Sequence, residues 1–347
     1  MAQPTFRPKD PPMSRHSTAT RPAALALSVV VASLVLSACG SPTGRTAIGQ
    51  PSLSLAAPLT TIGCTTTGVC VSVGASGGVS LPSTVGQVRN RRGTWSALNV
   101  PAAAVGSFSS GSCAASTCLF GGTQATGELL WSVDADTGAV TALTGPAGGV
   151  DVRALSCSSD TDCAALDQTA ANVMRLSFTR DGAGTWSATR VLPWAAGASV
   201  ALDCPTAQHC LVAASEHAGA TLRETFDAGA SWRVVPTPAT WNSIRALSCV
   251  VTCTALVVDA AGSAVATQGV TSWRQSPLGF SGSDLSCSAG TCGVVGYRAD
   301  QSAAMALWKK SLVPVKLTYV PTPLDAVACA PSVCVAIGVS TVVSMRP

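Results

Sequence analysis

Short apolar runs alternate with polar turns along most of the chain, and residues 200–238 show the pattern in full: VALDCPTAQHCLVAASEHAGATLRETFDAGASWRVVPTP. An apolar run leads into the first cysteine, and a second run, CLVAA, starts at the next one. The alternating TLRETF and the run SWRVVP follow after turns rich in Gly and Ala. Alternation with a period of two, with turn residues between the runs, indicates β-strands. The segment therefore predicts four short strands, and no helical stripe of apolar residues follows the N-terminal region.

This four-strand pattern recurs at regular intervals, each time around two close cysteines. The first cysteines of successive couples lie 38 to 49 residues apart. The seven couples are Cys64 and Cys70, Cys113 and Cys118, Cys157 and Cys163, Cys204 and Cys210, Cys249 and Cys253, Cys287 and Cys292, and Cys329 and Cys334. A period of this size is typical of repeat architectures. Four strands per repeat predict an all-β fold, a seven-bladed β-propeller with four antiparallel strands per blade.

Each couple is predicted to form one disulfide across a hairpin. Directly opposed residues in an antiparallel pair have Cα atoms about 4.5 to 5.5 Å apart, within disulfide reach. Zinc is the alternative, but it would need two couples to converge or a histidine to help, and only His209 and His217 lie beyond the N-terminal region. We therefore predict no metal and no cofactor. Closing so small a loop should contribute about 2 kcal/mol, and it would fix the register of strands made of small residues.

The N-terminus has the pattern of an export signal. Basic residues end near Arg21, and the apolar run PAALALSVVVASLVLSAC follows. Its last four residues, Leu36-Ser37-Ala38-Cys39, resemble the lipobox of bacterial lipoproteins. The resemblance implies cleavage before Cys39 and lipid on its thiol, against the alternatives of a plain transmembrane anchor or ordinary cleavage. The chain could also start at Met13.

The lipobox and the repeats together predict three parts of the chain: a lipoprotein signal peptide (1–38), a lipidated tether (39–48) and a propeller (49–347). It places the protein at the extracytoplasmic face of a bacterial cell membrane, with Cys39 holding it there. Beyond residue 38 the chain has 17 basic and 16 acidic residues and no polybasic segment, which argues against nucleic acid as a partner. With 47% hydrophobic and only 11% charged residues, it can bury a large core. We expect a monomer.

A more specific motif lies in the third turn of two repeats. Thr225-Phe226-Asp227-Ala228-Gly229-Ala230-Ser231-Trp232 resembles the Asp-box, S/T-x-D-x-G-x-S/T-W, of BNR-repeat propellers such as sialidases, sortilin-type receptors and photosystem assembly factors. The segment TRDGAGTW, with Asp181 and Trp186, matches except that Ala183 replaces the glycine. The resemblance implies structural roles for Asp181, Trp186, Asp227, Gly229 and Trp232, away from any ligand.

The two ends of the repeat region suggest how the ring closes. The last repeat stops three strands in, after CVAIGVSTVVSMRP, and GQPSLSLAAP precedes the first repeat. We predict that Gly49 to Pro58 forms the fourth strand of the last blade. Closure of this kind removes exposed sheet edges.

The face opposite the disulfide hairpins carries the candidate binding residues, which lie in second turns and in links between repeats. They are Trp194, Trp241, Arg245, Phe280, Tyr297 and Arg298. Aromatic residues and arginines of this kind are typical of recognition surfaces, although the tryptophans could instead pack between blades. We expect a non-catalytic module that binds a protein or glycan at the cell envelope.

Two other functions stay open. A sialidase-like glycoside hydrolase would need a tyrosine–glutamate pair and three arginines. Tyr297 and Tyr319, the three glutamates at 128, 216 and 224, and Arg153, Arg245 and Arg298 are the available residues, and no motif assigns them these roles. The third possibility is an assembly factor that holds a client protein transiently. We predict no catalytic residues.

Overall fold

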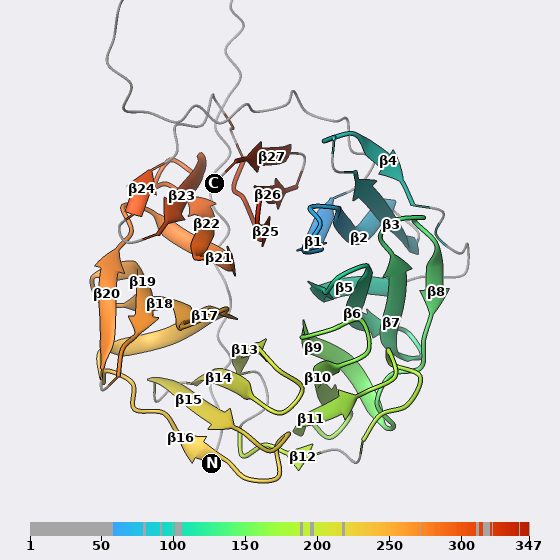
Figure 1. Cartoon of the computed structure of the whole chain (residues 1–347), viewed down its shortest axis with the longest axis horizontal. Helices are drawn as coiled ribbons and strands as arrows, with labels where there is room; N and C mark the ends of the chain where they lie inside the picture. The colour runs from blue at the N-terminus through green and yellow to red at the C-terminus, as the bar shows by residue number, and fades with distance from the viewer. Residues whose placement is uncertain are drawn as a thin grey trace, which may run out of the picture. The chain divides into compact units, whose positions relative to one another are not determined.

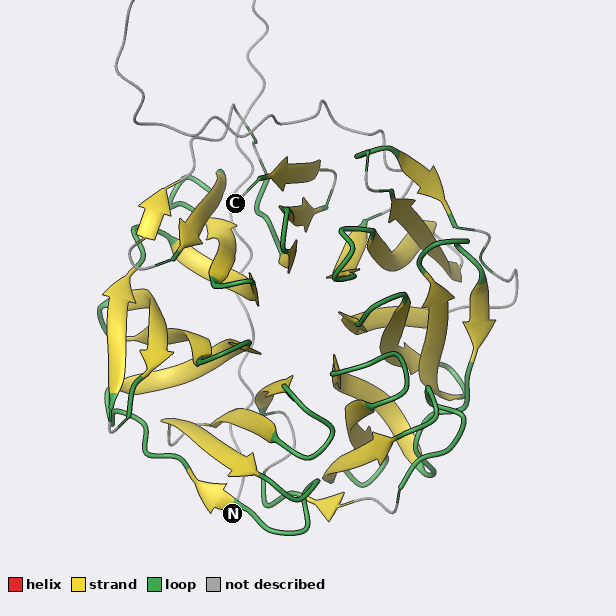
Figure 2. Ribbon diagram, in the orientation of Figure 1, coloured by secondary structure: helices red, strands yellow, loops and turns green. Residues whose placement is uncertain are grey.

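The computed structural model describes most of the chain after residue 57. The described residues are 58–78, 81–90, 92–98, 100, 106–187, 190–194, 198–216, 219–270, 272–309, 312–314, 320, 322–339 and 341–346. The predicted signal peptide, Cys39 and the tether lie outside them. In this part of the chain every regular element is a strand (Figure 2), and no helix is long and apolar enough to cross a membrane.

Six antiparallel sheets have four strands each, and we number them blades 1 to 6. Blades 1 and 2 contain β1 (Leu59–Cys64), β2 (Cys70–Gly78), β3 (Leu81–Arg89), β4 (Trp95–Ala97), β5 (Gly106–Cys113), β6 (Thr117–Gln124), β7 (Gly127–Asp134) and β8 (Val140–Ala142). Blades 3 and 4 contain β9 (Gly149–Cys157), β10 (Cys163–Thr169), β11 (Met174–Thr179), β12 (Arg190–Val191), β13 (Ser199–Asp203), β14 (Cys210–Glu216), β15 (Gly219–Thr225) and β16 (Arg233–Val234). Blades 5 and 6 contain β17 (Trp241–Cys249), β18 (Cys253–Asp259), β19 (Gly262–Gln268), β20 (Trp273–Pro277), β21 (Ser281–Ser288), β22 (Thr291–Tyr297), β23 (Ala303–Trp308) and β24 (Leu312–Pro314).

The remaining strands form a seventh sheet with three strands, β25 (Ala326–Ala330), β26 (Val333–Gly338) and β27 (Thr341–Met345). This sheet lies in the ring between blade 6 and blade 1 (Figure 1), where β25 contacts both β21 and β1. The prediction of seven four-stranded blades is therefore corrected to six. The strand expected to complete the last blade, Gly49 to Pro58, lies outside the described residues except for Pro58.

The hydrophobic core is divided into clusters between neighbouring sheets. Phe108, Phe120 and Trp131 pack edge to face between blades 1 and 2, with ring centroids 4.7 and 6.3 Å apart. Two further clusters lie on either side of the three-stranded sheet. Each large apolar side chain buried in this way contributes about 1.5 to 3 kcal/mol. Contact between every sheet and its two neighbours therefore stabilises the ring.

Small residues let the sheets approach closely. The second strands are buried along almost their whole length, as in CAALD of β10 and CLVAA of β14, because a sheet covers each of their faces. At Gly121 of β6 a Cβ atom would lie 2.5 Å from a methyl carbon of Val152 in the next blade. The abundance of Ala and Gly in the sequence thus has a packing cause.

The structure joins all seven predicted cysteine couples as disulfides, with Cα atoms 3.9 to 4.0 Å apart. Six couples, from Cys64 and Cys70 to Cys329 and Cys334, are directly opposed in the sheet register. Each bond links the innermost strand of a sheet to the next strand outward. The prediction of one disulfide hairpin per sheet is confirmed.

Candidate functional site

A central cavity of about 640 Å³ runs between the innermost strands of the sheets. Its lining comes from β1, β5, β9, β13, β17, β21 and β25, whose places nearest the axis are visible in Figure 1. Most lining side chains are small, with serine and threonine hydroxyls from several sheets. The cavity thus offers a polar surface to which every sheet of the ring contributes.

A β-bulge in five of the innermost strands places one residue at this cavity. In each strand the register skips the residue four positions before the first cysteine of the couple. These bulge residues are Thr60, Ser109, Arg153, Arg245 and Ser283. All five line the cavity. Because bulges re-aim side chains and often lie next to functional sites, we treat this ring of bulge residues as the candidate site.

Three of the bulge residues also bind the neighbouring sheet. Each donates a side-chain hydrogen bond to the carbonyl oxygen five positions before the next sheet's first cysteine. The pairs are Thr60 Oγ1 to Phe108 at 2.8 Å, Ser109 Oγ to Val152 at 2.7 Å, and Arg245 Nη1 to Gly282 at 2.7 Å. The geometry of the bulge ring is therefore fixed by the propeller framework.

The two arginines make the ring electrostatically asymmetric. Arg153 of β9 pairs with Asp151 at 3.0 Å, and 36% of its side chain is exposed. Arg245 lies on β17, so the two strands flank β13, while Asp325 lines the cavity beside β25 on the far side of the ring (Figure 1). That side of the lining holds both guanidinium groups together with Asp203 of β13, and an acidic group entering the cavity would meet the two arginines there. Guanidinium groups favour carboxylates and phosphates because their planar N–H donors match both oxygens of such groups.

A belt of hydrogen bonds between sheets also lines the cavity, at the residue before the first cysteine in five sheets. There a side-chain oxygen accepts the backbone N–H of the first cysteine in the next sheet. The acceptors are Ser112, Ser156, Asp203, Ser248 and Ser286, and the donors are Cys157, Cys204, Cys249, Cys287 and Cys329, at 2.5 to 3.0 Å. At the other two junctions the position is Gly63 or Ala328, which have no polar side chain. The belt satisfies backbone donors that would otherwise be unpaired at the cavity wall.

Two carboxyl groups in the cavity wall have altered acidity. Desolvation by burial raises the pKa of Asp203 to about 6, although it accepts hydrogen bonds from Cys249 N and Ser156 Oγ. Burial likewise raises the pKa of Asp284 to about 6, and this side chain accepts the N–H of Val327. Within the described residues, no three His, Cys, Asp or Glu side chains gather as a metal site.

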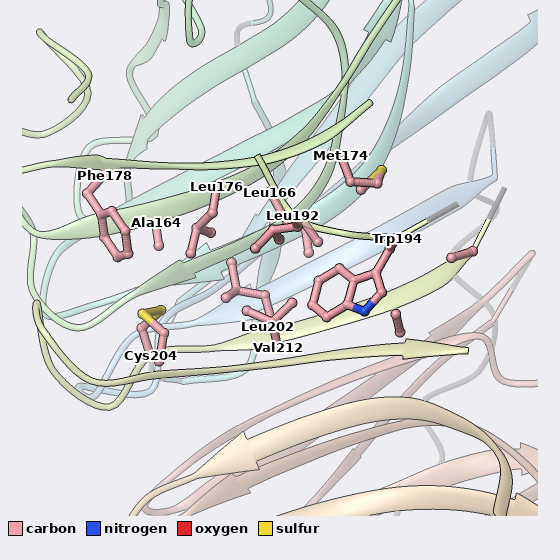
Figure 3. Close-up of a cluster of buried hydrophobic side chains, with 14 residues drawn as sticks. Ala164, Leu166, Met174, Leu176, Phe178, Leu192, Trp194, Leu202, Cys204 and Val212 are labelled. Carbon is pink, nitrogen blue, oxygen red and sulfur yellow. A yellow bond between two sulfur atoms is a disulfide. The ribbon is translucent and has the colours of Figure 1, made fainter. Parts of the chain in front are cut away.

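The structure corrects the predicted binding face at both tryptophans. Trp194 is 8% exposed and packs between blades 3 and 4 among Leu192, Leu202 and Val212 (Figure 3). Trp241 is 2% exposed and packs edge to face against Trp273. Trp194 lies in the link from blade 3 to blade 4, and Trp241 is the first residue of β17, so both rings stand where the chain enters a new sheet and fill the gap between sheets. They are core residues.

The other predicted residues do not form one surface with Arg245. Phe280 packs partly buried against the cluster between blades 5 and 6. Tyr297 is half-buried at the end of β22, and Arg298 is exposed and donates from Nη1 to the carbonyl of Ala303. Of the predicted face, only Arg245 lines the central cavity.

The residues of the sialidase-like alternative are also dispersed. Glu128 interacts with Asp167 and Arg175 between blades 2 and 3, and burial together with the Asp167 carboxylate raises its pKa to about 8. Glu224 binds His209 and Arg233. Among the described lining residues of the cavity there is no tyrosine and no glutamate. Tyr319 and His217 lie outside the described residues.

The two turns that resemble Asp-boxes have the same hydrogen bonds. Asp227 Oδ1 accepts from Thr225 Oγ1 and Ser231 N, both at 2.8 Å, and Asp181 is bound in the same way. The hydroxyl groups of Thr185 and Ser231 also donate to Asp181 and Asp227, and these bonds, with the others, lower the pKa of both aspartates to about 2. Trp186 donates from its indole to the Thr144 carbonyl of the preceding blade, and Trp232 packs against the cluster between blades 3 and 4. All of these contacts hold a turn or join two blades.

The sequence reasoning missed the bulge ring and the belt. The belt becomes visible when the repeats are aligned on their first cysteines, because Ser or Asp stands one position before the cysteine in five repeats. The same alignment places Arg153 and Arg245 four positions before it. A bulge itself leaves no mark in the sequence, since the pairing partner alone reveals the skipped residue.

No protein-family model matches the chain, and no curated protein matches its sequence. Solved structures do match. A chain of the mitotic checkpoint complex has a TM-score of 0.62 and 13% identity over 94% of this chain and 99% of its own. Virginiamycin B lyase from Staphylococcus aureus has a TM-score of 0.58 and 10% identity over 84% of this chain and 96% of its own.

Two further matches concern enzymes or their domains. The GH74 enzyme of Niastella koreensis has a TM-score of 0.60 and 10% identity over 87% of this chain and 53% of its own. The β-propeller domain of the Trilobed protease from Pyrococcus furiosus has a TM-score of 0.60 and 6% identity over 82% of this chain and 92% of its own. At such identities the likeness concerns the fold alone. The chain is a β-propeller.

Proposed function

We propose that the protein is an exported, lipid-anchored propeller that binds a ligand without catalysis at the cell envelope. The observation that carries this proposal is the ring of bulge residues at the central cavity. In each of five strands a β-bulge places one side chain at the cavity, and two of these side chains are arginines. Bulges of this kind are features that a fold retains for a purpose.

The chemistry of the cavity defines the class of ligand. Arg153 and Arg245 can bind an acidic group, and the hydroxyl groups of the ring can bind polar atoms next to it. The cavity is lined by small side chains and offers no large apolar surface. A glycan or protein segment that carries a carboxylate or phosphate fits these features.

The envelope location is supported by the disulfides. Disulfides form and persist in oxidising compartments, so seven of them in one chain favour a site outside the cytoplasm. The lipobox-like segment ending at Cys39 would hold the propeller at the membrane through several acyl chains. Ligand capture would then take place at the cell surface.

An array of acidic and neutral glycans, with a matched set of acidic and neutral peptides, tests the proposal. Binding to acidic members should be lost when Arg153 and Arg245 are both replaced by Gln. The matched control is Arg298→Gln, since Arg298 is an exposed arginine outside the cavity lining. Equal binding by the double variant and the wild type would refute the cavity as the site. Cleavage of an array member by the wild type would favour the hydrolase instead.

A further inference from the structure

The third turns of blades 3 and 4 are two copies of the same local structure with different surfaces. Thr179 to Asp181 and Thr225 to Asp227 have the same hydrogen bonds. In blade 3 the residue before the threonine is Phe178, which is buried, and the residue after it, Arg180, is exposed. Blade 4 reverses this order. Glu224 is 3% exposed, and Phe226 is 52% exposed.

The buried carboxylate of blade 4 organises the side chains around it. Glu224 Oε1 lies 2.7 Å from His209 Nε2, and Glu224 Oε2 accepts from Arg233 Nε at 2.7 Å and Nη2 at 2.5 Å. His209 stacks on the Phe226 ring with centroids 4.5 Å apart and planes at 18°. The guanidinium carbon of Arg233 lies 4.7 Å from the centre of the same ring. An exposed phenyl ring is thus held between two nitrogen-bearing side chains.

The fold does not require this arrangement. Blade 3 builds the same turn with an apolar residue inside and a charged residue outside, as the hydrophobic effect favours. Blade 4 instead buries a carboxylate and exposes a phenyl ring, and both changes cost free energy. Glu224 therefore has a role in positioning His209 and Arg233 against Phe226, which fixes three rotamers before any partner arrives. Preorganised aromatic and arginine side chains are typical of binding hot spots.

The charges around this cluster favour an acidic partner. The Arg233 side chain is 63% exposed, and its bonds to Glu224 use Nε and Nη2, so Nη1 is available. Arg190 of blade 3 lies against the same turn, with its Cγ 3.5 Å from the position of a Cβ at Gly229. The one exposed carboxylate of the turn, Asp227, already accepts hydrogen bonds from Thr225 and Ser231. Two arginines and a phenyl ring therefore face solvent together.

We propose that Phe226, Arg233 and His209 form a docking site for a polypeptide segment that carries a carboxylate beside an apolar side chain. The carboxylate binds Arg233, and the apolar side chain packs on the exposed edge of Phe226. The site is separate from the central cavity. Ala228 N donates to the Gln208 carbonyl at 3.0 Å, which binds the turn to the disulfide loop of blade 4. Arg245 instead lies four residues before Cys249 on β17, toward the face opposite the disulfide loops.

A displayed library of random dodecapeptides, selected on the full-length chain, tests this site. Enriched peptides should pair Asp or Glu with a neighbouring apolar residue. The best synthetic peptide should bind about tenfold or more weakly to Phe226→Arg, which copies the blade 3 turn, and to Arg233→Gln. Arg245→Gln should leave its affinity unchanged, which separates this site from the proposed cavity function. Unchanged melting temperatures show that the variants fold, and Arg233→Gln serves alone if Phe226→Arg does not.

Three results would overturn the proposal. The first is a selection without an acidic and apolar consensus, and the second is equal affinity for wild type and both variants. The third comes from sedimentation with vesicles of phosphatidylglycerol and phosphatidylethanolamine. If the wild type binds such vesicles and Phe226→Arg does not, while no peptide is enriched, the surface contacts a membrane instead of a protein.

Discussion

Replacing Asp203 by Ser should make the propeller more stable at alkaline pH. Four other sheets carry serine at the corresponding position, and serine can accept the N–H of Cys249 as Asp203 does. Burial raises the pKa of Asp203 from its usual 3.8 to about 6. The folded state therefore disfavours the carboxylate. The unfolding free energy is therefore highest below about pH 4, where Asp203 is protonated in the folded and the unfolded chain. It falls as the pH rises through 6, where the folded chain also loses the proton.

The size of this effect follows from the two pKa values. A shift of about two units corresponds to roughly 3 kcal/mol as an upper bound. Between pH 4 and pH 8 the wild type should thus lose up to about 3 kcal/mol of unfolding free energy relative to Asp203→Ser. Asp203→Ala removes the acceptor as well, so it should be less stable than Asp203→Ser by about 1 to 3 kcal/mol at both pH values.

Urea denaturation followed by tryptophan fluorescence measures these differences, with the disulfides left intact. The wild type, Asp203→Ser and Asp203→Ala should be compared at pH 4.5 and pH 8. The reasoning is refuted if the wild type and Asp203→Ser show the same pH dependence. That result would mean that the carboxylate at the cavity wall is well solvated.

Three further predictions concern other parts of the chain. Ser248→Ala leaves the N–H of Cys287 without its acceptor and should lower the unfolding free energy by about 1 to 2 kcal/mol. Urea titrations measure this, and a urea midpoint equal to that of the wild type would contradict a stabilising role for the belt. Glu128→Gln should match the wild type near pH 4 and become progressively more stable than it between about pH 4.5 and pH 8, because over this range the unfolded chain has released the Glu128 proton while the folded chain, with its raised pKa, still holds it; a stability curve parallel to the wild type from pH 4.5 to pH 8 would argue against this. Cys39→Ser should move the protein from the membrane fraction to the soluble fraction and abolish palmitate labelling, while persistent membrane association would point to an uncleaved anchor.

The repeat structure was predictable because its signals are local. Two cysteines four to six residues apart can pair only across a short turn, so the spacing of Cys249 and Cys253 already fixes a hairpin. The period of the couples then gives the sheets, and alternating runs such as TLRETF give the strands within them. Within the described residues the last sheet has three strands in place of the four that the repeat predicts, and no local signal indicates this difference.

The candidate site was less predictable because it depends on contacts between sheets. Trp194 lies in a link and Trp241 starts β17, and the sequence does not say whether a side chain at such a position points outward or between blades. Arg245 was placed on the predicted binding face, whereas Arg153 was named only among the arginines of the sialidase-like alternative, since only the bulges bring both to one ring. Phe226 stands at an x position of the motif, and its contacts with His209 and Arg233, both bound to Glu224, leave no mark in the sequence.

The central proposal is that Arg153 and Arg245, which line the central cavity, capture a ligand there. Crosslinking in native envelopes, with mass spectrometric identification of the captured species, tests it most directly. The wild type should capture a partner or an acidic glycan that the variant with both arginines replaced by Gln does not, and Arg298→Gln should behave as the wild type. Equal capture by the double variant and the wild type would contradict the claim and move the site away from the bulge ring.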